Sequence, residues 1–424
     1  MTRFFYSLLI YLLVPITPFK LLWRGWRQPA YLKNWSERYG FFSIIPSKPI
    51  IWIHCVSVGE TRAAQVVVNE LLRLYPENQI LITHATPTGR ETSERIFGDR
   101  ILRCYLPYDL PGASRRFIEH FEPIIGVLME TELWFNLIAT CSKKKIPLIL
   151  ANARLSEKSA QGYKKVKRLS RQGLRDLTLI AAQNEEDASR FIELGASKVI
   201  VTGNMKFDVL PPKDASILAQ ALREKVAMDR PVFLAASTRD GEEELIINAI
   251  NSAQSKFLTI LVPRHPERFN LVADLLKRQG ISFFRRTEIL NNALPHDFSN
   301  YRVLLGDSMG EMFTYYGACD FAFVGGSLLD FGGQNLIEAC LMAKPVVIGP
   351  FTYNFKRITE LAVEAGAVIR IQEAGNLSKV IDRLITDKGM REAMGHAAFE
   401  FSKRETGASK ELLRFIEEIV PRTV

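Results

Sequence analysis

Cysteine and histidine are scarce in this chain of 424 residues, and neither forms a disulfide or metal-binding pattern. The absence of a C-x-x-C pair argues against a disulfide framework and a cysteine zinc site, and it fits a reducing compartment. The five cysteines are Cys55, Cys104, Cys141, Cys319 and Cys340. The six histidines contain no H-E-x-x-H or H-x-x-x-H spacing, so the sequence predicts no metal centre.

A phosphate-binding G-x-x-x-x-G-K-[ST] motif is also absent, which argues against a P-loop NTPase. The chain is 47% hydrophobic and 24% charged, which excludes a disordered protein. Its 55 basic residues outnumber its 46 acidic residues, and the net charge is +9. This charge favours anionic partners, namely phosphates, nucleic acid or an acidic membrane surface.

The amino terminus lacks an apolar run long enough for a simple membrane span. Residues 4–19 carry no charge, but these 16 residues fall short of the roughly 20 that a spanning helix needs. Lys20 can snorkel, and Trp23 and Trp26 can lie at the interface. We therefore expect residues 1–30 to be a retained hydrophobic membrane-anchor helix that either spans the membrane or lies in its interface. A buried core helix and a cleaved signal peptide are the alternatives.

The charges around this segment predict its orientation. Only Arg3 and the terminal amine precede it, and four basic residues follow it: Arg24, Arg27, Lys33 and Arg38. The positive-inside rule then places the body of the protein in the cytoplasm. Pro15 and Pro18 are expected to kink a helix here.

Short runs rich in Ile, Val and Leu alternate with helical patterns along the rest of the chain. Such runs predict parallel strands covered by helices on both faces, and hence an α/β fold. The predicted strands are 50–58, 79–85, 100–107, 123–130, 146–153 and 177–183, then 231–237, 257–264, 281–284, 301–307, 321–327, 345–350 and 367–371. One helix is predicted over 63–74 and a final one over 400–419.

The alternation stops and restarts at a proline-containing stretch, which predicts two Rossmann-like domains facing each other across a cleft. The predicted boundaries are 31–205 for the first domain, 206–213 for a linker, 214–399 for the second domain and 400–424 for a C-terminal helix. Ligands of such sheets bind at the carboxyl ends of the strands, here in the cleft between the domains.

Carboxylates follow two predicted strands of the first domain. Glu60 ends the turn 57–60, where it either acts as a general base toward a hydroxyl or stabilises the start of a helix. Glu130 and Glu132 are an unusual acidic pair at a strand end, because charge there must be paired or hydrated. Their alternative role is to cap a helix.

Other turns suit an anion. Thr88, Gly89 and Arg90 offer a hydroxyl, a backbone N–H and a positive charge for a phosphate or carboxylate, or else form an ordinary capped turn. Arg264 can hold a phosphate in bidentate fashion. The adjacent His265 is either a structural, orienting residue or a catalytic one.

The most specific segment is 325–339, in which two glycine pairs precede a helix that carries Glu338. The glycines open the backbone toward a phosphate at the helix start. Gly326 and Ser327 lie at the beginning of this segment. Glu338 can accept hydrogen bonds from both hydroxyls of a ribose. A plain loop is the alternative. The strand–turn–helix at 306–312 likewise presents backbone amides at a helix start.

Taken together, these segments resemble the Kdo (3-deoxy-D-manno-octulosonic acid) transferase family of lipopolysaccharide assembly. The match covers nearly the whole chain and follows the family's order. The segments are S-V-G-E, T-P-T-G, M-E-T-E-L-W, G-N-M-K-F-D, A-S-T-R-D-G-E-E, V-P-R-H-P-E-R, G-D-S-M-G-E-M and G-G-S-L…G-G-Q-N-L-I-E.

The resemblance implies a glycosyltransferase B fold and an inverting, metal-independent transfer. Kdo moves from CMP-Kdo, a substrate rather than a cofactor, to the 6′-hydroxyl of the tetraacyl lipid A precursor. The first domain then binds this acceptor and the second binds CMP-Kdo. Glu60 matches the family's general base, and Glu130 matches an acidic residue of the catalytic site. Thr88, Gly89 and Arg90 are expected to bind an acceptor anion.

The resemblance also implies a set of donor-binding residues: Arg264, His265, Met309, Gly310, Glu311, Gly326, Ser327, Asn335 and Glu338. Three positions depart from the family pattern, because Arg239, Gln334 and Phe351 stand where the family often has histidine. Gln334 can hydrogen-bond but cannot take a proton at neutral pH, and Arg239 adds charge beside the donor.

A lipid acceptor calls for contact with inner-membrane lipids. The N-terminal helix is expected to make this contact together with a basic surface at 163–171, whose alternative role is a solvated charged face. Three other functions compete with the Kdo transferase. They are a UDP-sugar-dependent transferase such as a lipid A disaccharide synthase, a non-catalytic membrane-tethered binding protein, and a nucleic-acid-binding protein. No nucleic-acid-binding module is recognised, so nucleic acid is not expected as a partner.

Overall fold

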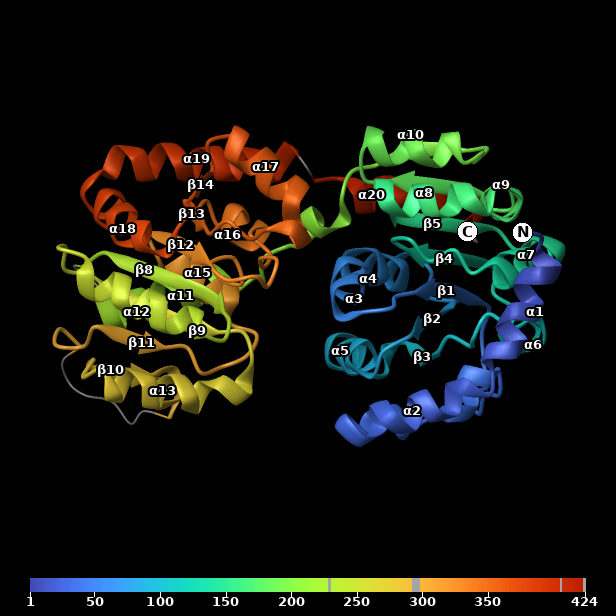
Figure 1. Cartoon of the computed structure of the whole chain (residues 1–424), viewed down its shortest axis with the longest axis horizontal. Helices are drawn as coiled ribbons and strands as arrows, with labels where there is room; N and C mark the ends of the chain where they lie inside the picture. Colours follow the sequence, from blue (N-terminus) through green and yellow to red (C-terminus); the bar gives the residue numbers. More distant parts are fainter. Residues whose placement is uncertain (228–229, 292–297, 405, 422–424) are drawn as a thin grey trace. The chain divides into compact units, whose positions relative to one another are not determined.

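The computed structural model describes residues 1–227, 230–291, 298–404 and 406–421. The chain forms two compact units (Figure 1). Unit 1 comprises Met1–Val209 and Glu405–Val424, and unit 2 comprises Leu210–Arg404. The C-terminal segment thus belongs to the same unit as the N-terminal half of the chain.

Unit 1 is built on a seven-stranded sheet in which every neighbouring pair is parallel, in the order β3-β2-β1-β4-β5-β6-β7. The strands are β1 (Ile50–His54), β2 (Gln79–His84), β3 (Leu102–Tyr105), β4 (Ile125–Met129), β5 (Leu148–Ala153), β6 (Leu179–Ala182) and β7 (Val199–Val201). Every residue of β1, β4, β5 and β6 is buried, as expected for strands covered on both faces.

Helices cover both faces of this sheet (Figure 1). The helices of unit 1 are α1 (Arg3–Leu13), α2 (Ile16–Arg27), α3 (Val58–Ala63), α4 (Gln65–Leu74), α5 (Pro87–Phe97), α6 (Pro111–Phe121), α7 (Phe135–Lys143), α8 (Glu157–Lys165), α9 (Lys167–Arg175), α10 (Glu185–Glu193) and α20 (Ala408–Ile419), of which α2 lies beyond the β3 edge of the sheet. Short 3-10 helices are η1 (Pro29–Leu32), η2 (Trp35–Tyr39), η3 (Gly98–Arg100) and η4 (Met205–Asp208). One apolar core lies under α6, α7, α8 and α9, and the other lies under α3, α4 and α20.

Unit 2 repeats this plan with a second parallel sheet, in the order β10-β11-β9-β8-β12-β13-β14. Its strands are β8 (Val232–Thr238), β9 (Leu258–Pro263), β10 (Phe283–Arg285), β11 (Val303–Leu305), β12 (Phe321–Val324), β13 (Val346–Ile348) and β14 (Val368–Arg370). Its helices are α11 (Ala215–Ala227), α12 (Glu242–Ser252), α13 (Phe269–Arg278), α14 (Arg286–Leu290), α15 (Met312–Ala318), α16 (Ile337–Leu341), α17 (Lys356–Glu364), α18 (Leu377–Thr386) and α19 (Lys388–Arg404). The 3-10 helices are η5 (Pro266–Arg268), η6 (Tyr353–Phe355) and η7 (Ala374–Asn376).

The predicted pair of Rossmann-like sheets is confirmed, with one strand added. The sequence analysis missed β7, whose three residues form an edge strand that is only partly buried. The predicted single helix over 63–74 begins earlier, as α3, and is interrupted at Ala64 before α4.

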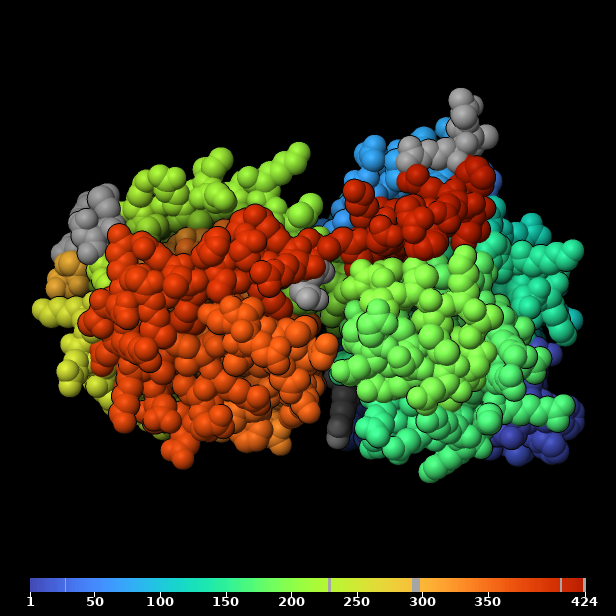
Figure 2. Space-filling model, turned by 90° about the horizontal axis from the view of Figure 1, so that it is seen from above, coloured from blue at the N-terminus to red at the C-terminus, as the bar shows by residue number. Residues whose placement is uncertain are grey.

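The prediction of one continuous final helix over 400–419 is wrong. Helix α19 ends at Arg404 and α20 begins at Ala408, after Gly407 in a left-handed conformation with φ +117°. The carboxylate of Asp208 accepts hydrogen bonds from the N–H groups of Gly407 and Ser409, at 2.6 and 2.5 Å. These bonds satisfy the start of α20, which packs on α4 of the same unit. Figure 2 shows α20, in red, on the surface of unit 1 beside the blue surface of its early helices.

The predicted single anchor helix is instead a pair, because α1 and α2 meet at Pro15 with a bend of 52°. Neither helix alone is long and apolar enough to cross a membrane. The two helices together have the length and the apolar composition that a membrane span needs. Apolar side chains of both helices are exposed, up to 87% for Trp26. One side of α1 is tied to unit 1, where Tyr6 donates to Asp109 and Ser7 to Asn136, each at 2.8 Å.

The basic stretch at 163–171 is likewise not one helix. Helix α8 ends at Lys165, and α9 begins at Lys167 after a break at Val166. The apolar face of α9 is buried through Leu169 and Leu174, and its basic side chains are exposed.

Candidate active site

Glu60 lies just after the carboxyl end of β1, in the first turn of α3. Ser57 caps this helix and donates from its hydroxyl to Oε1 of Glu60 at 2.9 Å. The N–H of Val56 donates to Oε2 at 2.7 Å. These hydrogen bonds correspond to the helix-start role, and the role of general base stays a prediction. The carboxylate braces the helix start, and its oxygens keep lone pairs that can accept another proton.

Burial makes this carboxyl group a weaker acid than an ordinary glutamate side chain. Glu60 is 6% exposed, and burial raises its pKa to about 7. The hydrogen bond from Val56 opposes this rise, and the negative charge of Glu130 adds to it. A carboxylate whose pKa lies near neutrality is suited to general-base catalysis.

Glu130 follows β4, the strand that pairs with β1, so the structure brings it to the same sheet edge as Glu60. Its φ of +60° is uncommon for a residue other than glycine. Its side chain forms an ion pair with Lys206 at 3.0 Å. Such backbone strain is typical of functional sites.

Asn152 holds the partner of Glu130 in place. It is the second left-handed residue at this edge, with φ +52°, and its Oδ1 accepts a hydrogen bond from Met205 N at 3.0 Å. Met205 precedes Lys206 in η4, so Asn152 fixes the segment that delivers the lysine to Glu130. The sequence analysis had assigned Lys206 to a linker.

The predicted anion site at 88–90 is occupied by internal contacts. Arg90 pairs with Glu37 at 2.6 Å, and the N–H of Gly89 donates to Thr86, which caps α5. Thr88 is exposed at the surface. The charge of Arg90 is thus already matched by a carboxylate, so its main visible role is to hold η2 against the sheet.

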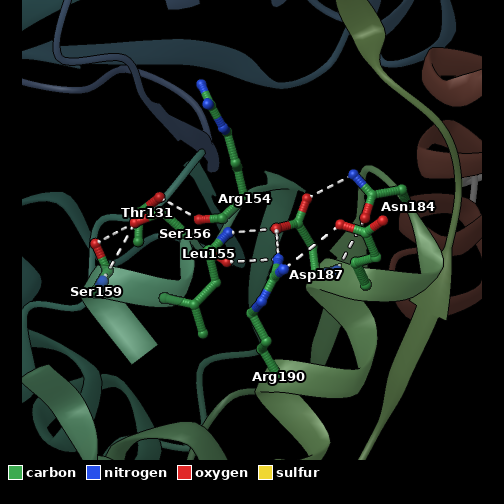
Figure 3. Close-up of polar contacts among 9 residues, drawn as sticks. Thr131, Arg154, Leu155, Ser156, Ser159, Asn184, Asp187 and Arg190 are labelled. Atoms are coloured by element: carbon green, nitrogen blue, oxygen red, sulfur yellow. Dashed lines mark hydrogen bonds and ion pairs between the residues drawn. The ribbon is translucent and has the colours of Figure 1, made fainter. Parts of the chain in front are cut away.

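The turn after β5 supplies a basic residue that the sequence analysis did not consider. Asp187 accepts from Leu155 N at 2.8 Å, and Arg190 donates to Leu155 O at 3.1 Å, which clamps this turn to α10. Thr131 donates from its hydroxyl to the carbonyl oxygen of Arg154. Figure 3 shows the exposed side chain of Arg154 pointing away from these contacts.

The predicted donor-binding residues of unit 2 gather at the carboxyl edge of its sheet. Arg264 and His265 follow β9, and Arg239 follows the neighbouring β8. Arg239 donates from Nη1 to His265 Nε2 at 2.9 Å, and its guanidinium lies 4.8 Å from the ring centre of Phe331. Burial and the nearby positive charges, with Arg239 foremost, lower the pKa of His265. Because a guanidinium can only donate, Nε2 of His265 is the acceptor, and the lowered pKa favours the neutral ring.

The loop after β11 carries Met309 and Gly310, both exposed, the glycine with φ +85°. Glu311 pairs with Arg286 at 2.6 Å. Partial burial opposes ionisation of its carboxyl group, but the hydrogen bonds from Arg286 and Ser308 outweigh it and lower the pKa. The structure thus gives Glu311 a partner within unit 2.

The amides expected to face a phosphate are already paired. Gly326 N and Ser327 N donate to the carboxylate of Glu242, at 2.6 and 2.9 Å. The hydroxyl of Ser327 donates to Val324 O and accepts from Gly349 N. Gly326 and Ser327 therefore shape the loop after β12, and the prediction that their N–H groups are open to a phosphate is corrected.

Asn335 and Glu338 lie at the end of the same loop, both half-buried. Asn335 Oδ1 accepts from Ile337 N at 3.1 Å, and Glu338 lies in the first turn of α16. Gly332 and Gly333 precede them with φ values of +83° and +81°, conformations that favour glycine. Among the residues that the structure describes, no three His, Cys, Asp or Glu side chains gather as a metal site.

A family model described as 3-deoxy-D-manno-octulosonic-acid transferase (Kdo transferase) matches residues 33–209. A 3-deoxy-D-manno-octulosonic acid transferase from Haemophilus influenzae is 39% identical over 432 residues, which cover 100% of both chains. The chain belongs to the Kdo transferase family. A transferase of the same name from Bordetella pertussis is 40% identical over 393 residues, which cover 90% of each chain. Membership of the Kdo transferase family makes this protein a glycosyltransferase.

A more distant structure supports the fold alone. The UDP-GlcNAc 2-epimerase from Neisseria meningitidis, solved with UDP-GlcNAc, matches with a TM-score of 0.58 at 16% identity. The match covers 87% of this chain and 100% of the epimerase chain. This member of the Kdo transferase family therefore has two Rossmann-like sheets of the glycosyltransferase B type.

Three residues at these edges escaped the sequence analysis. Lys206 is in a segment that composition assigned to a linker, Arg154 is a single arginine after a strand, and Glu242 is one of three consecutive glutamates. The N-A-R-L-S run at the carboxyl end of β5 carried a usable signal for Arg154, because polar residues at such a strand end mark ligand sites in α/β sheets.

Proposed function

We propose that this enzyme transfers Kdo from CMP-Kdo to the 6′-hydroxyl of a lipid A precursor, with Glu60 as the general base. The observation that carries the proposal is the buried Glu60 carboxyl, with a pKa of about 7, at the carboxyl edge of the sheet in unit 1. Membership of the family identifies Kdo as the transferred sugar. The resemblance of the motifs is the basis for naming CMP-Kdo as the donor and the lipid A precursor as the acceptor.

The reaction needs one proton acceptor and one stabilised leaving group. Glu60 removes the proton from the acceptor hydroxyl, and the oxygen of that hydroxyl attacks the anomeric carbon of Kdo. The bond from this carbon to the phosphate oxygen breaks on the opposite face, CMP leaves with the electron pair, and the configuration inverts. No metal takes part. We assign Arg264 the role of stabilising the charge on the departing phosphate, and Asn335 and Glu338 the role of holding the nucleotide.

Acceptor binding is assigned to unit 1 and donor binding to unit 2. Arg154 provides positive charge at the edge that carries Glu60, which suits a phosphorylated acceptor. His265, Met309, Gly310 and Glu311 are assigned to the donor because they share the edge of the unit 2 sheet with Arg264. Thr88, Gly89 and Arg90 support this machinery through the contacts of α5 rather than by direct anion binding.

We further propose that the protein resides at the inner membrane, with both units on the cytoplasmic side. The exposed apolar side chains of α1 and α2 support contact with acyl chains. An open pocket of about 580 Å³ on α9 supports contact with anionic headgroups. It is lined by Lys167, Arg168, Arg171, Gln172, Arg175 and Asp176. Basic and apolar surfaces in the same unit suit an interfacial enzyme.

A direct assay tests the proposal. Purified enzyme in mild detergent is mixed with freshly made CMP-Kdo and the lipid A precursor, and the product is weighed by mass spectrometry. We expect a mass increase of one or more Kdo residues, and we expect Glu60→Gln to lower the rate by roughly 10²–10⁴-fold. Glu70→Gln is the control, because Glu70 pairs with Arg73 on the outside of α4.

Two results would contradict the proposal. Normal transfer by Glu60→Gln would remove Glu60 as the base. Transfer from a UDP-sugar, with none from CMP-Kdo, would reassign the donor and leave Glu60 as a base toward another acceptor.

A further inference from the structure

Glu242 is a buried carboxylate surrounded by backbone N–H groups. It is 0% exposed and lies at the first position of α12. Its Oε1 accepts from Ser327 N and Leu328 N, both at 2.9 Å. Its Oε2 accepts from Gly326 N at 2.6 Å and from Arg239 N at 2.8 Å. No basic side chain is needed to compensate this charge, because four N–H dipoles converge on it.

Three of these N–H groups are consecutive and form a concave donor site. Gly326 has φ +66°, which turns successive amides toward one point. Such concave amide sites after a strand commonly bind phosphates. In unit 2 the protein's own carboxylate takes the place that an anionic ligand would otherwise have.

The same carboxylate joins loops that follow different strands. Arg239 follows β8, and residues 326–328 follow the neighbouring β12. Ser327 extends the connection to a third loop, because its carbonyl accepts from Phe351 N, after β13, at 3.0 Å. One buried side chain therefore organises the loops at the exits of β8, β12 and β13.

We propose that Glu242 is a positioning residue that holds these loops in the shape that binds CMP-Kdo, before the nucleotide arrives. A consequence is that the donor phosphate is held by groups other than the amides of 326–328, and Arg264, which follows β9 beside β8, is the group we assign to it. This inference rests on the proposed function for the identity of the donor. The internal connection itself is independent of that identity.

The first experiment is residue-resolved hydrogen exchange on the full-length, donor-free enzyme. We expect slow exchange at the amides of Arg239, Gly326, Ser327 and Leu328, and no further slowing at 326–328 when CMP is added. Rapid exchange at 326–328 without CMP, or strong new protection there with CMP, overturns the proposal. This readout requires no catalytic activity, so it stands even if CMP-Kdo proves not to be the donor.

The second experiment compares two neighbouring buried carboxylates. Glu242→Gln loses one acceptor oxygen and brings an NH₂ group against backbone N–H groups, so we expect KM for CMP-Kdo to rise roughly 10–100-fold while kcat changes less than about threefold. Glu243→Gln is the matched control. Glu243 is 1% exposed, but it bonds to Thr238 Oγ1 and Arg268 and not to the loop amides. We expect this control to lower Tm without raising that KM.

Glu242→Asp keeps the charge on a shorter side chain and is expected to restore part of the lost donor affinity. If Glu242→Gln does not fold, Glu242→Asp carries the comparison with Glu243→Gln. An equal rise of KM in the control and the Glu242 variants shows that general destabilisation is responsible, and it overturns the positioning role. A fall in kcat with unchanged KM overturns it as well.

Discussion

The acidity of Glu60 depends on which charged residues lie beside it. Burial is the largest cause of its raised pKa, and Glu130 adds to the effect because a second negative charge opposes ionisation of Glu60. Lys206 pairs with Glu130 at 3.0 Å and so partly cancels that charge. Glu130 therefore raises the pKa of Glu60, and Lys206 weakens this effect by neutralising part of the charge of Glu130.

This arrangement predicts opposite shifts of the pH–rate profile. The base is active when deprotonated, so activity rises with pH through a value near 7. Glu130→Gln removes a negative charge, lowers the pKa of Glu60 and moves this rise to lower pH by roughly one pH unit. Lys206→Met leaves Glu130 uncompensated and moves the rise to higher pH. The measurement is kcat/KM against pH for both variants, and shifts in the same direction would contradict the assignment.

At the residue scale, the sequence indicated which side chains are suited to catalysis or binding better than it indicated which residues those side chains contact. Glu60 could be selected because a carboxylate after a strand and a glycine is suited to bind or accept a proton. The partner of Arg90 could not be selected, because Glu37 lies 53 positions away. Lys206 and Glu130 are 76 positions apart, and only the sheet order brings them together. Gly326 and Ser327 were predicted to present free amides because nothing local identifies Glu242, 84 positions earlier than Gly326, as their acceptor.

At the scale of elements, the start of α20 depends on Asp208 of η4, which lies 199 positions before Gly407 in the sequence. Asp208→Ala removes the acceptor for the N–H groups of Gly407 and Ser409. We expect it to lower the free energy of unfolding by about 1–2 kcal/mol. Thermal or urea unfolding measures this, with Asp274→Ala, an exposed position inside α13, as the control. An unchanged stability would show that the cap contributes nothing.

The elements also show why the boundaries of helices were harder to predict than the strands. Thirteen apolar runs predicted strands correctly, because burial on both faces requires continuous apolar residues. The missed β7 is short and partly exposed, so its apolar signal is weak. The break between α19 and α20 depends on Gly407 and on Asp208, which helical periodicity does not register.

For the whole molecule, the exposed apolar surface of α1 and α2 predicts binding to lipid vesicles. Replacing Phe19 and Trp26 together by Ser removes two large apolar side chains that are 71% and 87% exposed. We expect the fraction of protein that sediments with phosphatidylglycerol–phosphatidylcholine vesicles to fall several-fold. The control replaces Leu210 and Ile217, which are 74% and 72% exposed in unit 2, by Ser. An equal loss in both variants would show that the helix pair has no special role.

The return of the chain to unit 1 also has a consequence for biosynthesis. Ala408, Leu412 and Ile416 complete the apolar core beside α4, yet in the sequence they come after the whole of unit 2. The whole of unit 2, Leu210–Arg404, is made between the two parts of unit 1. At typical translation speeds of about 5–20 residues per second, this takes roughly 10–40 s. During that interval the nascent unit 1 carries an uncovered apolar face, which makes it a natural client for a chaperone until α20 has been made.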